Sequence, residues 1–409
     1  TFAARFPSSI FVTLTLIVLA AVLWNTTDPQ RALWTTFLFA TSGLTIAAAK
    51  MSITDGVLIL FVTISQLCLY AIWRGRAGWP VIITFGLANG FGLLTKGPVV
   101  LGVMGMTCLA LIALRWSDHP QQAGPLGPGD PDLKVRLGIS KHPLAKSIVA
   151  ILLMLAVVGP WLYAIEHRNP GYTWRTIRTE VLNRAATPQE GHKGPPGYYL
   201  LTIWLTFFPW CLLLPMTLLH AWRNRSSPQV RFALAAVIGP WIMFEIVATK
   251  LPHYLLPIFP ALAFLTADAL LRRGRPLKSI AMTGFAMFVV VAVLYALILP
   301  RTNWLRVSQR VADILIHQGA THEHDAIMID YKEPSLAFYQ GGTIREQRNN
   351  DYIHTTPPSG WPRWIVLTSE VWNQTPPPIK DQLQIIGDVK GLDYADGWRK
   401  IDVLVLRKR

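Results

Sequence analysis

A short acidic motif at the start of an apolar segment carries the best candidate for a catalytic residue. The motif Lys50-Met-Ser-Ile-Thr-Asp55 places a carboxylate where an apolar run begins. An aspartate at the edge of a membrane helix is costly unless it is paired, so it suggests a functional role. Asp also caps helix starts and suits the helix dipole, which is the structural alternative. We take Asp55 as the candidate catalytic residue and Lys50, close by in the sequence, as a candidate substrate-binding cation.

Two further turns carry groups that suit a phosphate. Lys96 lies in the turn LLTKGP, where one apolar run ends and the next begins. Helix N-termini and ammonium groups both favour phosphates, although a lysine at this level also snorkels to an interface in many membrane proteins. The turn Lys250-Leu-Pro-His253-Tyr254 combines a cation, an imidazole and a phenol. We expect Lys96, Lys250, His253 and Tyr254 to bind substrate.

The segment 166–197 is the third source of candidates and is rich in basic residues. Arg184 can hold a phosphate through two hydrogen bonds, and His192 can act as a base or as a metal ligand. One histidine with a few carboxylates is a weak metal signal, and the pair Tyr198-Tyr199 is also typical of an aromatic interface belt. The candidate substrate-binding residues here are Arg184, His192, Lys193 and Tyr199.

Composition indicates that these turns connect membrane helices. Of 409 residues, 52% are hydrophobic and 15% charged, whereas soluble domains carry about 25% charged residues. A window of about 20 apolar residues predicts about ten spans, of which two could be re-entrant or tilted. They are 9–24, 33–49, 56–73, 79–95, 98–114, 147–165, 198–220, 231–248, 254–271 and 279–299.

The distribution of basic residues predicts the orientation. Fifteen lysines and arginines lie in one alternating set of loops and nine in the other, so the richer set, including the loop 116–146, is predicted to be cytoplasmic. All the candidate motifs then share the outer side. The formal net charge of +15 does not indicate a nucleic-acid partner, because the basic residues lie in short loops between apolar runs. An anionic ligand would explain why five basic residues crowd into the outer loop 166–197.

The composition changes after Pro300. Residues 301–319 have apolar side chains at helical spacing, at Trp304, Val307, Val311, Ile314 and Leu315. Four strand-like segments follow, DAIMID, RWIVLT, QLQIIGDV and IDVLVL. The sequence therefore predicts an all-α multi-pass membrane domain at 1–300 and a small extracytoplasmic α/β domain at 301–409.

The motifs together resemble the C-type (GT-C) glycosyltransferases. Their order is KMSITD, LLTKGP, ExxxR…HKGPPGYYL, FFPW and KLPHYLLPxxPALA. The resemblance covers roughly residues 1–300 and is strongest to the aminoarabinose transferases of lipid A and their protein O-mannosyltransferase-like bacterial relatives. LTKGP and KLPHY are together quite specific.

The resemblance implies a function. Such enzymes move a sugar from a polyprenyl-phosphate donor to a lipid, glycan or protein acceptor on the outer face of the cell (inner) membrane. Asp55 is similar to the second essential aspartate of the family. Lys96, Arg184 and Tyr254 resemble residues around the carrier or acceptor phosphate, and His192 and Lys193 match an outer loop that orders when the lipid enters.

One departure concerns the leading catalytic aspartate. The family carries it in an outer loop after its first membrane helix, and nothing before Phe6 supplies that motif here. We expect that the sequence is an N-terminally cut fragment; a second polypeptide that supplies the loop and an inactive form are the alternatives. No cofactor is certain, and a divalent metal stays open because its ligands in that loop cannot be checked.

Two other classes of protein fit parts of the pattern. A transporter or flippase would explain the spans and the intramembrane acids Asp55 and Glu245, but transporter sites lie near mid-membrane. A catalytically inactive protein that binds polyprenyl phosphate would explain the missing loop. The retained set of Asp55, Lys96 and Arg184 argues against it.

Overall fold

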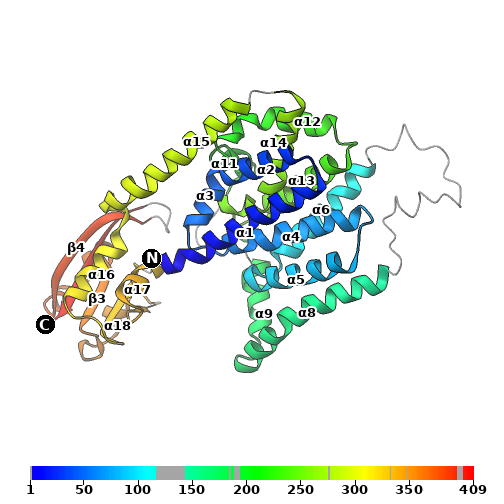
Figure 1. Ribbon diagram of the computed structural model, residues 1–409. Coiled ribbons are helices and arrows are strands. Elements are labelled where there is room, and N and C mark those ends of the chain that lie inside the picture. Colours follow the sequence, from blue (N-terminus) through cyan, green and yellow to red (C-terminus); the bar gives the residue numbers. More distant parts are fainter. Residues whose placement is uncertain are drawn as a thin grey trace, which may run out of the picture. The chain divides into compact units, whose positions relative to one another are not determined.

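The structure divides the chain into a helical unit, residues 1–289, and a mixed α/β unit, residues 290–409. We call them the membrane unit and the C-terminal unit (Figure 1). It is a computed structural model that describes residues 2–116, 143–183, 186–187, 194–274, 277–331, 333–347, 349–393 and 399–409. Most of the predicted cytoplasmic loop 116–146, and part of the outer loop 166–197, lie outside these residues.

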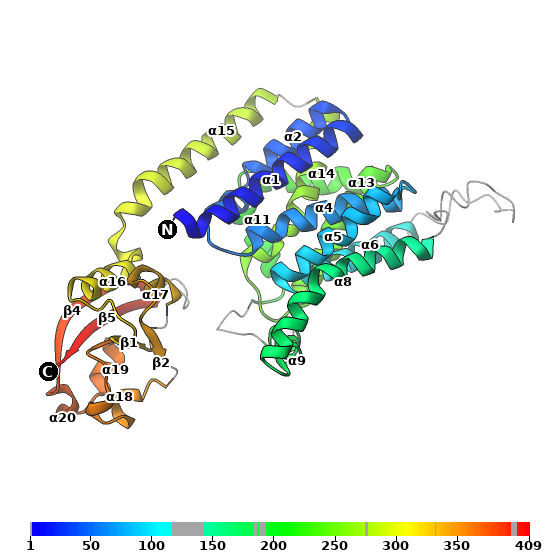
Figure 2. The ribbon, with the colours of Figure 1, turned by 60° about the horizontal axis from the view of Figure 1, so that its bottom comes forward.

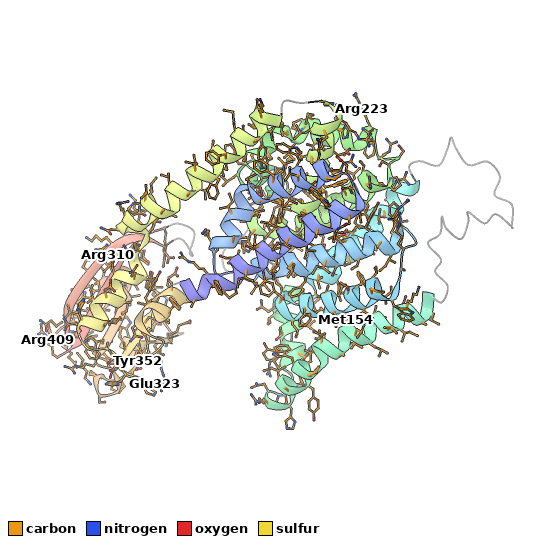
Figure 3. All side chains as sticks on the ribbon, in the orientation of Figure 1. Met154, Arg223, Arg310, Glu323, Tyr352 and Arg409 are labelled. Atoms are coloured by element: carbon orange, nitrogen blue, oxygen red, sulfur yellow. The ribbon has the colours of Figure 1, made fainter. Side chains whose placement is uncertain are left out.

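Helices form the whole framework of the described membrane unit. Helix α4 packs between α1 and α5, and α5 packs between α4 and α8 (Figure 2). Side chains fill the space between neighbouring helices (Figure 3). The elements are α1 (Phe2–Thr26), α2 (Pro29–Ala40), α3 (Gly43–Lys50), α4 (Asp55–Trp73), α5 (Trp79–Lys96), α6 (Val99–Trp116), α8 (Pro143–Arg168), α9 (Tyr172–Thr176), η1 (Ile177–Asn183), α11 (Tyr198–Thr206), η2 (Trp210–Leu213), α12 (Leu214–Arg223), α13 (Pro228–Ile246), η3 (Pro252–Ile258), α14 (Phe259–Arg272) and α15 (Leu277–Val293).

Fewer of the described helices have the length and apolarity of a membrane span than the sequence predicts. Among the described residues, six helices are long and apolar enough to cross a membrane, or up to eight if two bent helix pairs count as one span each. The predicted spans 79–95 and 98–114 correspond to α5, which carries Asn89 and Lys96, and to α6, whose apolar part is shorter, Val99–Leu114. The count of ten is therefore not confirmed, although each of the ten segments is helical.

The two bent pairs meet at their breaks. Helices α2 and α3 bend by 62°, and the pair formed by α11 and residues 210–223 bends by 119°. The amide of Gly43, at the first break, donates to the carbonyl of Phe208, at the second, over 2.9 Å. Trp210 Nε1 also donates to Thr41 Oγ1 over 3.1 Å. A lipid-exposed break leaves backbone groups without partners, and here each break satisfies part of the other.

The C-terminal unit is a five-stranded sheet with helices on it. The strand order is β2-β1-β3-β5-β4, with β1 parallel to β2 and β3 and the remaining pairs antiparallel. The strands are β1 (Ala326–Ile329), β2 (Arg345–Gln347), β3 (Trp364–Thr368), β4 (Leu383–Asp393) and β5 (Arg399–Lys408). The helices are α16 (Val307–His317), α17 (Pro334–Gln340), α18 (Tyr352–Thr355), α19 (Ser369–Gln374) and α20 (Pro377–Lys380).

Alternation along the strands builds one core on each face of the sheet. Met328 and Val366 belong to one core and Ile327 and Ile365 to the other, as expected for side chains that alternate between faces. The four predicted strands and the predicted helix are confirmed, although Trp304 lies before α16 in a separate helical turn (η6, Asn303–Leu305). The sequence analysis missed β2, because its residues are polar and number only three.

Candidate active site

The start of α4 holds Asp55 in a position that is almost completely buried. Asp55 is the first residue of the helix and only 4% exposed, so the positive end of the helix dipole favours its charge. Helix α1 lies directly against this turn: Ser8 Oγ donates to the carbonyl of Ile53 over 3.1 Å. A Cβ at Gly56 would lie 2.8 Å from that of Ser8, so the close approach requires glycine. The motif that the sequence analysis selected is therefore packed closely against α1.

Lys96 is the partner of Asp55. Its Nζ lies 2.8 Å from Oδ1 and 2.7 Å from Oδ2 of the carboxylate. The lysine stands at the C-terminal end of α5, where a cation is favoured by the helix dipole. Sequence analysis expected Lys50 to lie near Asp55, but Lys50 is exposed at the end of α3, and the carboxylate pairs with Lys96 instead.

The turn before α14 completes the cluster. His253 Nε2 lies 3.7 Å from Asp55 Oδ2, and the ring of Tyr254 lies 4.7 Å from Lys96 Nζ. The two aromatic rings meet edge to face at 5.1 Å. Asp55, Lys96, His253 and Tyr254 thus come together from α4, α5 and η3, although about 200 residues separate the first from the last.

Exposure differs across the cluster. The side chain of Asp55 is 5% exposed, whereas those of Lys96 and His253 are 25% and 22% exposed. An anion that approaches from outside therefore meets the ammonium and the imidazole before the carboxylate. Charge-assisted hydrogen bonds to phosphate are among the stronger polar contacts. The arrangement therefore suits a phosphate bound at Lys96 and His253, with the carboxylate of Asp55 buried beside it.

Lys250 has internal partners of its own. Its Nζ lies 3.2 Å from Glu245 Oε1 and donates to the carbonyl of Pro195 over 3.3 Å, and the residue is 7% exposed. Glu245 also accepts from the backbone amides of Gly197 (2.7 Å) and Tyr199 (3.4 Å) at the start of α11. We call Glu245 and Lys250 the clamp, because they join α13, the 249–253 turn and the end of the outer loop. The sequence analysis did not foresee this role.

The remaining candidates are placed as follows. Tyr199 is fully buried, and its ring packs edge to face against that of Tyr198 at 5.1 Å, so it serves the core. Arg184, His192 and Lys193 lie outside the described residues. Within the described part of the chain, no three His, Cys, Asp or Glu side chains gather as metal ligands would.

A second charged cluster, at the other end of the helices, was missed. Asp268 of α14 is fully buried and forms ion pairs with Arg31 (3.1 Å), His220 (2.8 Å) and Arg272 (3.2 Å). A buried charge needs such partners. Asp268 lies inside the predicted span 254–271, near its basic end. This isolated aspartate was the one signal in the sequence that could have predicted the cluster.

Comparison with known proteins points to one group of membrane enzymes. Residues 1–170 match the family model of dolichyl-phosphate-mannose-protein mannosyltransferases. The undecaprenyl phosphate-alpha-4-amino-4-deoxy-L-arabinose arabinosyl transferase of Yersinia enterocolitica is 30% identical over 273 residues, 65% of this chain and 45% of that protein. The protein of the same name from Pseudomonas paraeruginosa is 30% identical over 306 residues, 72% of this chain and 51% of that protein.

A solved structure has the same fold. The crystal structure of ArnT from Cupriavidus metallidurans bound to undecaprenyl phosphate superposes with a TM-score of 0.67 at 17% identity, and the match covers 98% of this chain and 83% of that one. The chain therefore shares the fold of this ArnT structure, and most of its length is similar in sequence to the arabinosyl transferases. It spans about half the length of the curated relatives that it matches.

The family model covers part of the cluster. Asp55 and Lys96 lie inside the matched residues 1–170, and His253 and Tyr254 lie beyond them. Asp55 and Lys96, the two cluster residues inside the matched range, also form the shortest contacts in the cluster. The imidazole and the phenol are added by η3, a segment that is distant in sequence.

Proposed function

We propose that this protein is a membrane glycosyltransferase that takes a sugar from a polyprenyl-phosphate donor. The supporting observation is the convergence of Asp55, Lys96, His253 and Tyr254 at one end of the helices. The relatives are named for a donor in which undecaprenyl phosphate carries 4-amino-4-deoxy-L-arabinose, and we propose a donor of that class. The acceptor in this proposal is an anionic lipid of the lipid A type; a glycan or a protein hydroxyl is the alternative.

In the proposed reaction, the bond between the anomeric carbon of the sugar and an oxygen of the carrier phosphate breaks. A bond from that carbon to the acceptor oxygen forms, and the phosphate leaves with the electron pair. Lys96 and the phenol of Tyr254 meet the negative charge that develops on the phosphate without having to move far. Asp55 takes the proton of the acceptor hydroxyl, or orients the acceptor and stabilises positive charge on the sugar; both roles stay open.

Location follows from the same proposal. We propose a multi-pass protein of the cell (inner) membrane with the cluster and residues 301–409 on the extracytoplasmic side. The excess of basic residues in the opposite set of loops supports this orientation.

Transfer and binding should be measured separately with the full chain in lipid nanodiscs. Undecaprenyl phosphate is the binding probe, and transfer of aminoarabinose from its undecaprenyl-phosphate conjugate to lipid A is the activity assay. We expect Asp55→Asn to abolish transfer and to retain binding of undecaprenyl phosphate. Binding by the unaltered chain without transfer would favour the inactive binding protein, and neither binding nor transfer would overturn the proposal.

A further inference from the structure

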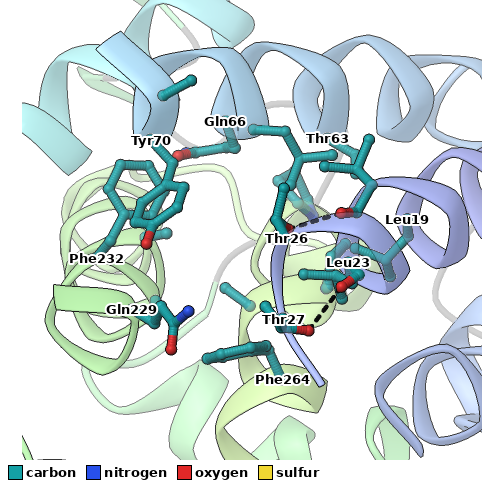
Figure 4. Close-up of a pocket in the computed structure, with 18 of the residues that line it drawn as sticks. Leu19, Leu23, Thr26, Thr27, Thr63, Gln66, Tyr70, Gln229, Phe232 and Phe264 are labelled. Atoms are coloured by element: carbon teal, nitrogen blue, oxygen red, sulfur yellow. Dashed lines mark hydrogen bonds between the residues drawn. The ribbon is translucent and has the colours of Figure 1, made fainter. Parts of the chain in front are cut away.

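An apolar cavity of about 180 Å³ lies among α1, α4, α13 and α14, away from the Asp55 cluster. Its walls change in character along its length. Toward the middle of the helices it is lined by the apolar side chains of Leu19, Ala236, Pro260 and Ala261, together with Thr63 and Gln66. At the other end the lining is polar, with Tyr70 and Gln229 on one side and Thr26 and Thr27 on the other (Figure 4).

The polar end lies where helices end. Helix α1 ends at Thr26, α4 ends at Trp73, and α13 begins at Pro228. The start of α4, with Asp55, is 18 residues before that end, which is about 27 Å along a helix axis. The polar end of the cavity, which we call its mouth, therefore lies at the end of the helices opposite the Asp55 cluster.

Two arginines lie near this mouth, and one of them, Arg31, is already paired with Asp268. Arg76 lines the cavity and is exposed. Arg31 stands behind the wall: its Nη1 donates to Gln229 Oε1 over 3.3 Å, and its guanidinium lies 5.9 Å from the centroid of the Phe264 ring. Both Gln229 and Phe264 line the cavity. A cationic mouth above an apolar slot matches an amphiphile with an anionic head, and basic pockets between membrane helices are known to bind anionic lipid headgroups.

We propose that this cavity binds an anionic phospholipid of the surrounding membrane, with an acyl chain in the apolar part and the phosphate at Arg76. The site does not depend on the proposed transferase activity, since it lies at the other end of the helices. Water is the competing occupant, because Thr63 Oγ1 and Gln66 Oε1 are buried in the wall without a hydrogen-bond partner in the described structure.

Native mass spectrometry of the full chain tests the site. The probes are phosphatidylglycerol, phosphatidylcholine with the same acyl chains, and undecaprenyl phosphate. We expect the unaltered chain to retain phosphatidylglycerol in preference to phosphatidylcholine. Arg76→Gln should reduce that preference about fivefold, the contribution typical of one basic residue at a membrane surface. Ala236→Phe should fill the slot and remove both phospholipids, with Ala261→Leu as a second filling variant in case the first does not fold.

Two controls make the result specific. Arg223→Gln removes an exposed cation outside the cavity lining, at the end of α12 (Figure 3). Ile242→Phe adds bulk at an exposed position of α13. Both should retain phosphatidylglycerol. Equal retention of the two phospholipids, no retention by the unaltered chain, or displacement of phosphatidylglycerol by undecaprenyl phosphate would each overturn the proposal.

Discussion

Lys96 Nζ sits between the two carboxylate oxygens of Asp55, 2.8 Å from one and 2.7 Å from the other. One ammonium thus satisfies the acid that the sequence marks as catalytic. A phosphate that binds Lys96 competes with Asp55 for the same charge. Donor binding and release of the carboxylate are therefore linked through a single side chain in the proposed reaction.

Removal of Lys96 should destabilise the membrane unit through Asp55. Lys96→Gln leaves a buried carboxylate without its cation, and we expect a loss of about 2–3 kcal/mol. This is below the usual range for fully buried pairs, because a quarter of the Lys96 side chain is exposed. The double change Asp55→Asn with Lys96→Gln should recover most of the loss. Thermal unfolding in detergent measures it, and Lys50→Gln is the control with no expected effect.

The clamp should act on donor binding from a distance. Glu245→Gln weakens the contacts to Lys250 and to two amides at the start of α11, which loosens the turn that positions His253 and Tyr254. We expect weaker binding of undecaprenyl phosphate, by about tenfold, for Glu245→Gln and for Lys250→Met, with no further loss in the double variant. Additive losses would show that Lys250 contacts the ligand directly.

Asp268 should matter far more for stability than one of its partners. Asp268→Asn leaves Arg31, His220 and Arg272 around a neutral side chain, and we expect a loss of about 3–5 kcal/mol. Arg272→Gln should cost below about 1 kcal/mol, because its side chain is 46% exposed. Thermal unfolding of both variants checks the order. Similar losses for both would mean that Arg272 is an essential partner.

The C-terminal unit should lose stability as pH rises. Burial and the neighbouring Asp393 raise the pKa of Glu333 to about 7. The folded unit therefore retains a proton that the unfolded chain has released, and stability falls between about pH 4.5 and pH 7 by roughly 2–3 kcal/mol. Above that window the loss is complete. Below it, the contribution of this group is unchanged.

Hydrogen exchange at the amides of β1 and β3 in the full chain, corrected for the intrinsic pH dependence, measures this effect. Glu333→Gln should remove most of the pH dependence and protect the unit at pH 8. Glu370→Gln, at an exposed position, is the matched control. Unchanged pH dependence in Glu333→Gln would assign the effect to another group.

Cysteine labelling should show which residues lie on each side of the membrane. Lys50→Cys and Gln318→Cys, both at exposed positions, should react with an impermeant reagent added outside. Arg223→Cys should react only after the membrane is opened. If Arg223→Cys reacts from the same side as the other two, the predicted orientation is wrong.

Sequence reasoning found four members of the cluster because each has a residue type that is costly in an apolar setting. Asp55, Lys96, His253 and Tyr254 lie in turns, where such groups stand out. It did not foresee the partners of Lys250, because they carry no signal in the sequence: Glu245 lies inside an apolar segment, and the other partner is the backbone carbonyl of Pro195. The break between α2 and α3 was hidden for a similar reason, since Thr41-Ser42-Gly43 interrupts the apolar window only briefly.

The contact between the two helix breaks also constrains how the protein is made. The amide of Gly43 donates a hydrogen bond to the carbonyl of Phe208, a residue that the ribosome adds 165 positions later. Until then, the first break is without this partner in an environment that penalises unpaired backbone groups. The α2–α3 segment can therefore reach its final packing only after α11 has been synthesised and inserted.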